Sequence, residues 1–493
     1  MRSHDLSLSI FILLLLLAPT AAQQPQQLAL TPIAPQPEPL GELHPKLRWM
    51  HDEKIRAMWI SYNLFDRFGD IEVTAGEGEK TKAAVLKETG FNVVSITMNV
   101  NSDGDPDGTT LDLRTIAPKH DRTRSTDIET RLAPNVAAAR EYGLTLLVGL
   151  KYGSNHLEPY RKYRGADGKL AKRSCCPLDE TYIAGPHVGN WAVRAAQLGA
   201  DGVNIDIEMY HSDASSYPGP CYCDDCFAIY LAAFARDSRR LYDQIRPEDR
   251  GRWIAERQGH DYGHGRWGGT HYVAFAARRI EALWDGIRRR CQAINPAFVL
   301  AQYHMLEAMP GMERGLGTAD VPCLMLSAHE YHSGPYRSSY ISKNRIREHL
   351  PVLFVSGLYV NVQWPERFAE NALRSCLYTD GYFVYYGSAL LNFPSPGQEK
   401  KAFPGGYGRW GNSSAAEYLN ELADAHTHIA ELLVAPPDTW PKRIDGKLRM
   451  LQERLQTAES EAEANPSAES QRAVEDTRKE LGRYRDLLDQ GGY

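Results

Sequence analysis

Two carboxylates end an otherwise apolar stretch near the middle of the chain, and their types and spacing suit acid–base chemistry. Residues 201–208 read DGVNIDIE, in which Asn204, Asp206 and Glu208 alternate with apolar residues. A period of two sends these polar side chains to one face of a strand. The charge of Asp206, one pleat away, favours a proton on Glu208 through like-charge repulsion. We therefore predict Glu208 as a general acid and base and Asp206 as its assisting carboxylate.

The same eight residues resemble the strand-four signature of glycoside hydrolase family 18, the chitinase family, which is Asp-Gly-x-Asp-x-Asp-x-Glu. The resemblance implies that Glu208 protonates a glycosidic oxygen and that Asp206 orients the acetamido group of the substrate as the nucleophile. It also implies an N-acetylhexosamine-containing glycan and retention of configuration. Asn204 stands where the family has an Asp, so this chain departs from the family's proton cycle, and we expect Asn204 to contact substrate.

Cysteines form a second constellation. The segment Cys221-Tyr-Cys223-Asp-Asp-Cys226 is similar to the Cys-x-Cys-x-x-Cys motif of family 42 β-galactosidases, where an upstream cysteine completes a structural zinc site. We take the fourth ligand from the upstream pair at 175–176 and predict Cys175, since four thiolates suit tetrahedral zinc. Disulfides are the alternative, because the N-terminus predicts export to an oxidising compartment. Catalysis itself is expected to require no cofactor.

The elements that must position these groups alternate between apolar strand-like runs and amphipathic helical stretches, which is typical of repeated βα units. Eight strand candidates are present, the number that a closed (β/α)8 TIM barrel needs. Helices are predicted at 80–89 and 128–142, ended by glycines that favour a left-handed C-cap. The predicted strands are Ala57–Tyr62, Asn92–Met98, Thr145–Leu150, Val203–Glu208, Phe298–His304, Cys323–Ala328, Val352–Tyr359 and Tyr382–Tyr386.

Long connections after several strands predict a cleft at the carboxyl end of the barrel, where active sites lie. His329 and Glu330 follow the sixth strand, where family 18 has a Tyr-Asp pair that touches substrate, and by strand count they are expected to contact substrate here. Flat aromatic rings stack on the apolar faces of sugars. The aromatic residues expected to line the cleft are Tyr303, Trp364, Tyr385 and Trp410.

The two ends of the chain differ from the barrel region. Residues 1–22 have the apolar run and small residues of a secretory signal peptide, and 23–45 form a Gln- and Pro-rich spacer. We assign 46–436 to the catalytic barrel and 437–493 to a charged helical hairpin, which either packs on the barrel or mediates self-association. The signal peptide predicts a secreted or periplasmic protein. The sequence has no second long apolar run, so we predict no membrane span.

Composition excludes some functions. The 493 residues carry 56 Lys and Arg against 62 Asp and Glu, a net charge of −6 with both signs dispersed, so no basic surface for nucleic acid is expected.

The sequence thus predicts an exported (β/α)8-barrel glycoside hydrolase acting on a carbohydrate. Two alternatives stay open. One is a two-carboxylate retaining glycosidase, β-galactosidase-like, with Glu330 or Glu366 as the second acid. The other is a carbohydrate-binding barrel without turnover.

Overall fold

The computed structural model describes most of the barrel and the C-terminal helices. The described residues are 39–60, 63–66, 68, 80–98, 110–112, 125–151, 161–180, 188–207, 220–258, 271–304, 311–327, 348–360, 363, 365–385, 387–391, 415–434 and 436–489. The predicted signal peptide and most of the spacer lie outside them. No helix within these ranges combines the length and the apolarity needed to cross a bilayer.

Eight parallel strands close into a barrel in the order β1-β12-β11-β10-β9-β8-β5-β2. The predicted fold class is therefore confirmed, and each predicted strand is found within two residues of its expected start. The strands are β1 Ile55–Ile60, β2 Val93–Met98, β5 Thr145–Lys151, β8 Gly202–Asp206, β9 Val299–His304, β10 Cys323–Ser327, β11 Val352–Tyr359 and β12 Gly381–Tyr385.

Strand residues alternate between two separate apolar cores. Val203, Ile205 and Ile207 belong to the large core between the strands and the surrounding helices. A smaller core fills the barrel interior and includes Leu147 and Val299 from the strands flanking β8. The alternation predicted for residues 203–207 is therefore confirmed, and Asn204 and Asp206 take the interior face.

The amino-terminal end of the barrel is sealed by the segment just before β1. Leu43, Leu47 and Met50 are buried in the interior core. Leu43 lies within the segment expected to be a spacer. There the backbone N–H of Gly41 donates a hydrogen bond to the Ala319 carbonyl at 2.9 Å, so this end of the segment is attached to the barrel. A packed plug at this end leaves the carboxyl end for chemistry.

Polar side chains clamp neighbouring strands at the same end. Asn92, immediately before β2, accepts a hydrogen bond from the backbone of Arg56 in β1 at 2.8 Å. Asp201, before β8, accepts one from Leu146 in β5 at 2.9 Å, and Asp380, before β12, accepts one from Phe354 in β11 at 2.8 Å. These bonds fix the start of each strand pair and so help to set the barrel's register.

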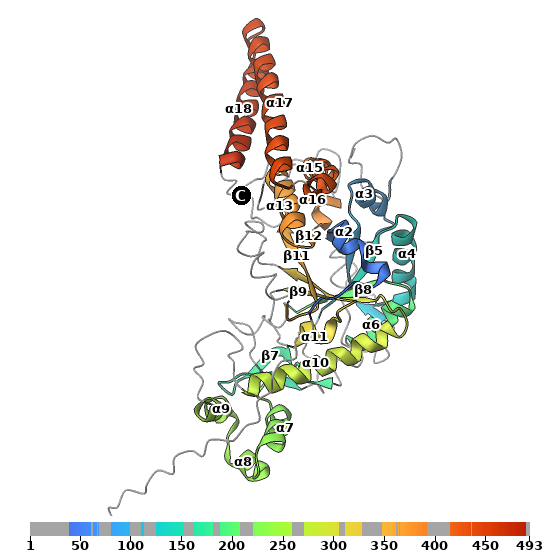
Figure 1. Cartoon of the computed structure of the whole chain (residues 1–493), viewed down its shortest axis with the longest axis vertical. Helices are drawn as coiled ribbons and strands as arrows, with labels where there is room; N and C mark the ends of the chain where they lie inside the picture. The colour runs from blue at the N-terminus through green and yellow to red at the C-terminus, as the bar shows by residue number, and fades with distance from the viewer. Residues whose placement is uncertain are drawn as a thin grey trace, which may run out of the picture.

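Helices surround the strands, and two small antiparallel sheets lie in the loops after β2 and β5 (Figure 1). The helices predicted before Gly90 and Gly143 are found as α3 and α4, and both glycines take positive φ, 93° and 62°. The small sheets, not predicted from sequence, pair β3 Thr110–Asp112 with β4 Ser125–Asp127 and β6 Lys162–Arg164 with β7 Leu170–Cys175. The helices are α2 Trp49–Asp52, α3 Lys82–Glu88, α4 Ile128–Glu141, α6 Gly189–Gln197, α7 Asp224–Phe234, α8 Ser238–Gln244, α9 Arg250–Gln258, α10 His271–Gln292, α11 Met312–Leu316, α13 Pro365–Tyr378, α14 Ser388–Leu391, α15 Ala415–Thr427, α16 Ile429–Val434, α17 Pro436–Ala464 and α18 Ala468–Asp489.

The predicted C-terminal hairpin is present as α17 and α18, which pack along one another and extend away from the barrel (Figure 1). Leu451, Ala458 and Leu481 are buried in the seam between them. Arg478 of α18 also forms an ion pair with Glu459 of α17 at 2.6 Å. The seam follows the three- and four-residue spacing of apolar residues that predicted it.

Candidate active site and cysteine cluster

The candidate active site begins on the interior face of β8. Asp206, the last residue of the strand, is 6% exposed, and its backbone pairs in register with Lys151 of β5 and Tyr303 of β9. Because parallel strands point the same way, these three residues, each within one residue of its strand's end, reach the carboxyl end of the barrel together. The structure therefore places the predicted assisting carboxylate at the end of the barrel where active sites form.

One layer deeper, Asn204 is fully buried and donates a hydrogen bond from Nδ2 to Ser95 Oγ of β2 at 3.3 Å. On β5, the strand between them, Gly149 pairs with Asn204, and a side chain at Gly149 would press on the backbone of Ile96 and Thr97 in β2. Oδ1 of Asn204 is buried without a hydrogen-bond partner among the described residues. A buried oxygen of this kind favours a bound water or another hydrogen-bond donor beside it.

Aromatic rings gather beside this carboxylate on the interior face. Tyr303 lies under Tyr385 of β12 with ring centroids 5.7 Å apart and planes only 10° from parallel. Trp59 of β1 meets Tyr303 edge-on at 4.6 Å, and Tyr359 of β11 stacks on Tyr385 at 5.6 Å. Tyr303 is buried, whereas Tyr359 and Tyr385 are half-buried. The cluster thus presents ring surface at the mouth of the barrel, which suits stacking on a sugar.

Trp59 is held in a fixed orientation. Its indole Nε1 donates a hydrogen bond to Thr97 Oγ1 of β2. Its ring contacts Tyr303, Phe383 and Tyr385. A ring with a satisfied N–H and neighbours on several sides forms a rigid base for the exposed tyrosines.

The structure brings together some of the predicted site residues. Asp206, Asn204, Tyr303 and Tyr385 share the interior face near the carboxyl end. Glu366, weighed as a second carboxylate, lies in the first turn of α13 and is half-buried. The remaining predicted residues, Glu208, His329, Glu330, Trp364 and Trp410, lie outside the described residues.

Trp59, Thr97 and Tyr359 were missed from sequence, although their position in the strand period would have found them. Each has the parity that points into the barrel, and each lies within two residues of the end of its strand. Assigning alternate residues to the interior face on all eight strands, and not only on the strand that carries the acids, identifies the aromatic cluster.

A separate cluster of four buried thiols lies in the loops after β5 and β8. The sulfur atoms of Cys176, Cys221, Cys223 and Cys226 all lie within 4.8 Å of one another. Cys176 replaces the predicted Cys175 as the fourth member of the cluster. The two residues are adjacent at the end of β7, and an extended chain sends successive side chains to opposite sides, so only one of them can reach the other three cysteines.

The spacing of the four sulfur atoms fits a tetrahedral metal ion. Cys176 Sγ is 3.4 Å from Cys226 Sγ and 3.8 Å from Cys223 Sγ. Zinc bound by four thiolates at about 2.3 Å requires sulfur separations of about 3.8 Å. All eight cysteines of the chain are described, and each is buried and free in this structure.

The surroundings of the cluster favour thiolates in some positions and resist them in others. Hydrogen bonds from Cys176, Cys221 and Cys226 lower the pKa of Cys223, which also precedes the first turn of α7. Burial raises the pKa of Cys176 and Cys221. Backbone N–H groups of Leu178 and Arg164 donate to Cys176 Sγ and Cys221 Sγ, each at 3.4 Å. A bound cation would stabilise the thiolate form of all four residues.

No profile of a known protein family matches this sequence, and no curated protein matches it. Among solved structures, a β-galactosidase from Bacillus circulans sp. alkalophilus has a TM-score of 0.44 at 13% identity, covering 77% of this chain and 56% of that one. A β-galactosidase from the psychrophilic Marinomonas ef1 has a TM-score of 0.44 at 11% identity, covering 78% and 61%.

A smaller structure gives a weaker match. The glycoside hydrolase domain of PelA from Pseudomonas aeruginosa has a TM-score of 0.31 at 11% identity, covering 68% of this chain and 95% of that one. The present chain spans less than two thirds of the length of either β-galactosidase.

Proposed function

We propose that this chain is a glycoside hydrolase that uses Glu208 as general acid and base and Asp206 as its assisting carboxylate. The observation that carries the proposal is the position of Asp206 on the interior face at the carboxyl end of β8, next to the ring of Tyr303. Glu208 follows Asp206 by two residues. A carboxylate beside aromatic rings at a barrel mouth suits an oxocarbenium-like transition state and a stacked sugar.

In the proposed reaction, Glu208 donates a proton to the leaving glycosidic oxygen. Asp206 holds the N–H of a 2-acetamido group, whose carbonyl oxygen then attacks the anomeric carbon. Water, deprotonated by Glu208, opens the resulting ring with retained configuration. This substrate class rests on the likeness of residues 201–208 to family 18, and the half-buried Tyr385 is assigned to sugar stacking.

The substrate assignment is tested with paired aryl glycosides that differ only in the 2-acetamido group. Asp206→Asn should lower the turnover of the acetamido substrate by at least about 100-fold, because the amide no longer polarises the nucleophile. Equal turnover of both substrates by the natural protein, with no effect of Asp206→Asn, would exclude substrate assistance.

A second candidate is a two-carboxylate retaining glycosidase acting on sugars without an acetamido group. The four-cysteine cluster favours it, since the motif at 221–226 resembles that of family 42 β-galactosidases. Glu366 is the described alternative acid, and Glu330 the other. Selective hydrolysis of non-acetamido galactosides, lost in one of the variants Glu366→Gln or Glu330→Gln, would select this candidate.

We also propose that the four-cysteine cluster holds a structural zinc ion. Cys176 comes from the hairpin β6–β7 after β5, and the other three cysteines precede and begin α7 after β8. A metal there would tie two loops at the carboxyl end of the barrel and would take no part in the chemical step. Export through the signal peptide at 1–22 and self-association through α17 and α18 complete the proposal. Fractionation and light scattering test these two points.

A further inference from the structure

The four-cysteine cluster places negative charge in a buried setting. A divalent ion with four thiolates has a net charge of −2, and all four cysteines are buried. Asp179, next to Cys176 in space and 3% exposed, adds another negative group. Burying uncompensated charge of one sign is costly, so a nearby cation would strengthen the site.

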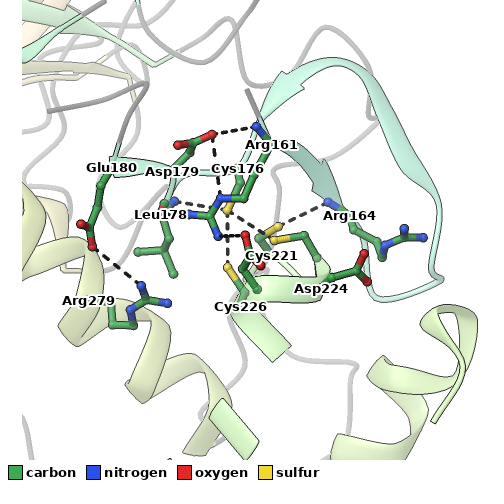
Figure 2. A network of polar contacts seen from close by, with 12 residues as sticks. Arg161, Arg164, Cys176, Leu178, Asp179, Glu180, Cys221, Asp224, Cys226 and Arg279 are labelled. Atoms are coloured by element: carbon green, nitrogen blue, oxygen red, sulfur yellow. Dashed lines mark hydrogen bonds and ion pairs between the residues drawn. The ribbon is translucent and has the colours of Figure 1, made fainter. Parts of the chain in front are cut away.

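Arg161 is a cation placed among these groups. Its backbone carbonyl accepts a hydrogen bond from the backbone of Cys176 at 2.7 Å, and its backbone N–H donates to Asp179 Oδ2 at 2.7 Å. Figure 2 shows its side chain in the same network of polar contacts as Cys176, Cys221 and Cys226. Nε of Arg161 lies 3.9 Å from Asp179 Oδ2.

The guanidinium of Arg161 also joins the two segments that supply the cysteines. It donates to Asp225 Oδ2 at 3.0 Å, and Asp225 lies in the first turn of α7 between Cys223 and Cys226. On the other side it donates to the carbonyl of Leu178, two residues after Cys176. One planar group therefore bridges the hairpin segment and α7 with two differently directed N–H donors.

We infer that Arg161 is a positioning residue of the cluster, which holds the two cysteine-bearing segments at metal-binding distance and offsets their negative charge. The inference rests on the proposed zinc site. It assigns to Arg161 a share of the metal affinity, and no part in the chemistry at Asp206. Groups that orient metal ligands in this way typically change affinity by about 10- to 100-fold.

The test compares three variants of the full-length protein. Arg161→Gln removes the charge and the bridge, whereas Arg161→Lys keeps the charge but cannot make both guanidinium bonds together. Lys162→Gln is the matched control, because it removes one positive charge from the adjacent, exposed residue of the same hairpin. The measurements are the zinc content by elemental analysis and the zinc affinity by competition with a chromogenic chelator.

We expect Arg161→Gln to bind zinc at least about 10-fold more weakly than the natural protein, Arg161→Lys to fall between the two, and Lys162→Gln to match the natural protein. Equal affinity in Arg161→Gln and Lys162→Gln would overturn the inference. If Arg161→Gln does not fold, the zinc affinity of Arg161→Lys decides the question. An affinity of Arg161→Lys equal to that of Lys162→Gln would then overturn the inference. A natural protein without zinc overturns the metal site itself, which separates the two failures.

Discussion

Asp206 of β8 and Tyr303 of β9 are register partners, so a carboxylate and an aromatic ring stand side by side on the interior face of the barrel. The ring is held from above by Tyr385 and edge-on by Trp59. This relationship joins a charge-bearing group to a rigid apolar surface. Both are needed by an enzyme that stacks a sugar while charge develops at its anomeric carbon.

The role of Asp206 predicts a specific loss of turnover. Asp206→Asn should lower kcat by at least about 100-fold and change the thermal midpoint little. Asp201→Asn is the matched control at the other end of the same strand, where the amide oxygen can still accept the bond from Leu146. Steady-state kinetics of both variants should leave Asp201→Asn within about twofold of the natural protein. Equal losses in the two variants would point to a structural role for Asp206.

The half-buried ring of Tyr385 predicts a loss of binding. Tyr385→Ala removes the stacking surface above Tyr303 and should lower kcat/KM by about 10-fold, which corresponds to about 1.4 kcal/mol. Tyr385→Phe keeps the ring and should retain most of kcat/KM. If the phenylalanine variant loses as much as the alanine variant, the hydroxyl group rather than the ring contacts the substrate.

His426 of α15 predicts how stability depends on pH. Burial, helped by the charge of Arg56 and opposed by the bond to the Thr89 carbonyl, lowers the pKa of His426 to about 3. The ring donates from Nδ1 to Thr89 and accepts at Nε2 from Tyr382, so the folded protein holds it neutral. Unfolding exposes a histidine that binds a proton below its ordinary pKa of 6.5. The stabilisation is therefore full above pH 6.5 and is lost as pH falls towards 3.

Denaturant unfolding at several pH values checks this prediction. His426→Gln should reduce the free energy of unfolding at pH 7.5 by about 1–3 kcal/mol and flatten its decline between pH 6.5 and pH 4. His428→Gln, two residues away in the turn between α15 and α16, is the control and should keep the natural slope. An unchanged slope in His426→Gln would assign the acid sensitivity to other groups.

Metal removal tests the cysteine cluster. Chelation should lower the thermal midpoint and make four additional thiols reactive to a thiol reagent, since Cys176, Cys221, Cys223 and Cys226 would lose their shared cation. Re-addition of zinc should restore both values. Thiols that become reactive only after reduction, in protein without metal, would instead assign these cysteines to disulfides.

The fold was predictable because local patterns and packing agree along the strands. Val203, Ile205 and Ile207 alternate with polar residues and do face the helices, and Gly90 and Gly143 end helices with the positive φ expected of them. The hairpin β6–β7 was not predictable in this way. Its strands are short, and Arg164 of β6 is held by hydrogen bonds to Cys221 and Tyr222, which lie just before α7 and far away in sequence.

The candidate site was predictable only in part. Asp206 and Tyr303 were found because each ends a strong strand pattern. The inward parity of Trp59 could be read from its strand, but its contacts with Thr97 and Tyr385 could not, because these residues lie far from it in sequence. The choice between Cys175 and Cys176 depended on the direction of two adjacent side chains, which the register of a short hairpin decides.

The central claim is that Glu208 delivers a proton to the leaving sugar oxygen, and leaving-group dependence tests it most directly. With a poorly activated aryl glycoside as substrate, Glu208→Gln should lower kcat by about 1,000-fold or more. With a dinitrophenyl glycoside, whose leaving group departs without protonation, the same variant should lower the rate of the glycosylation step far less. Equal losses with both leaving groups, or no loss with either, would contradict the assignment of Glu208 as the general acid.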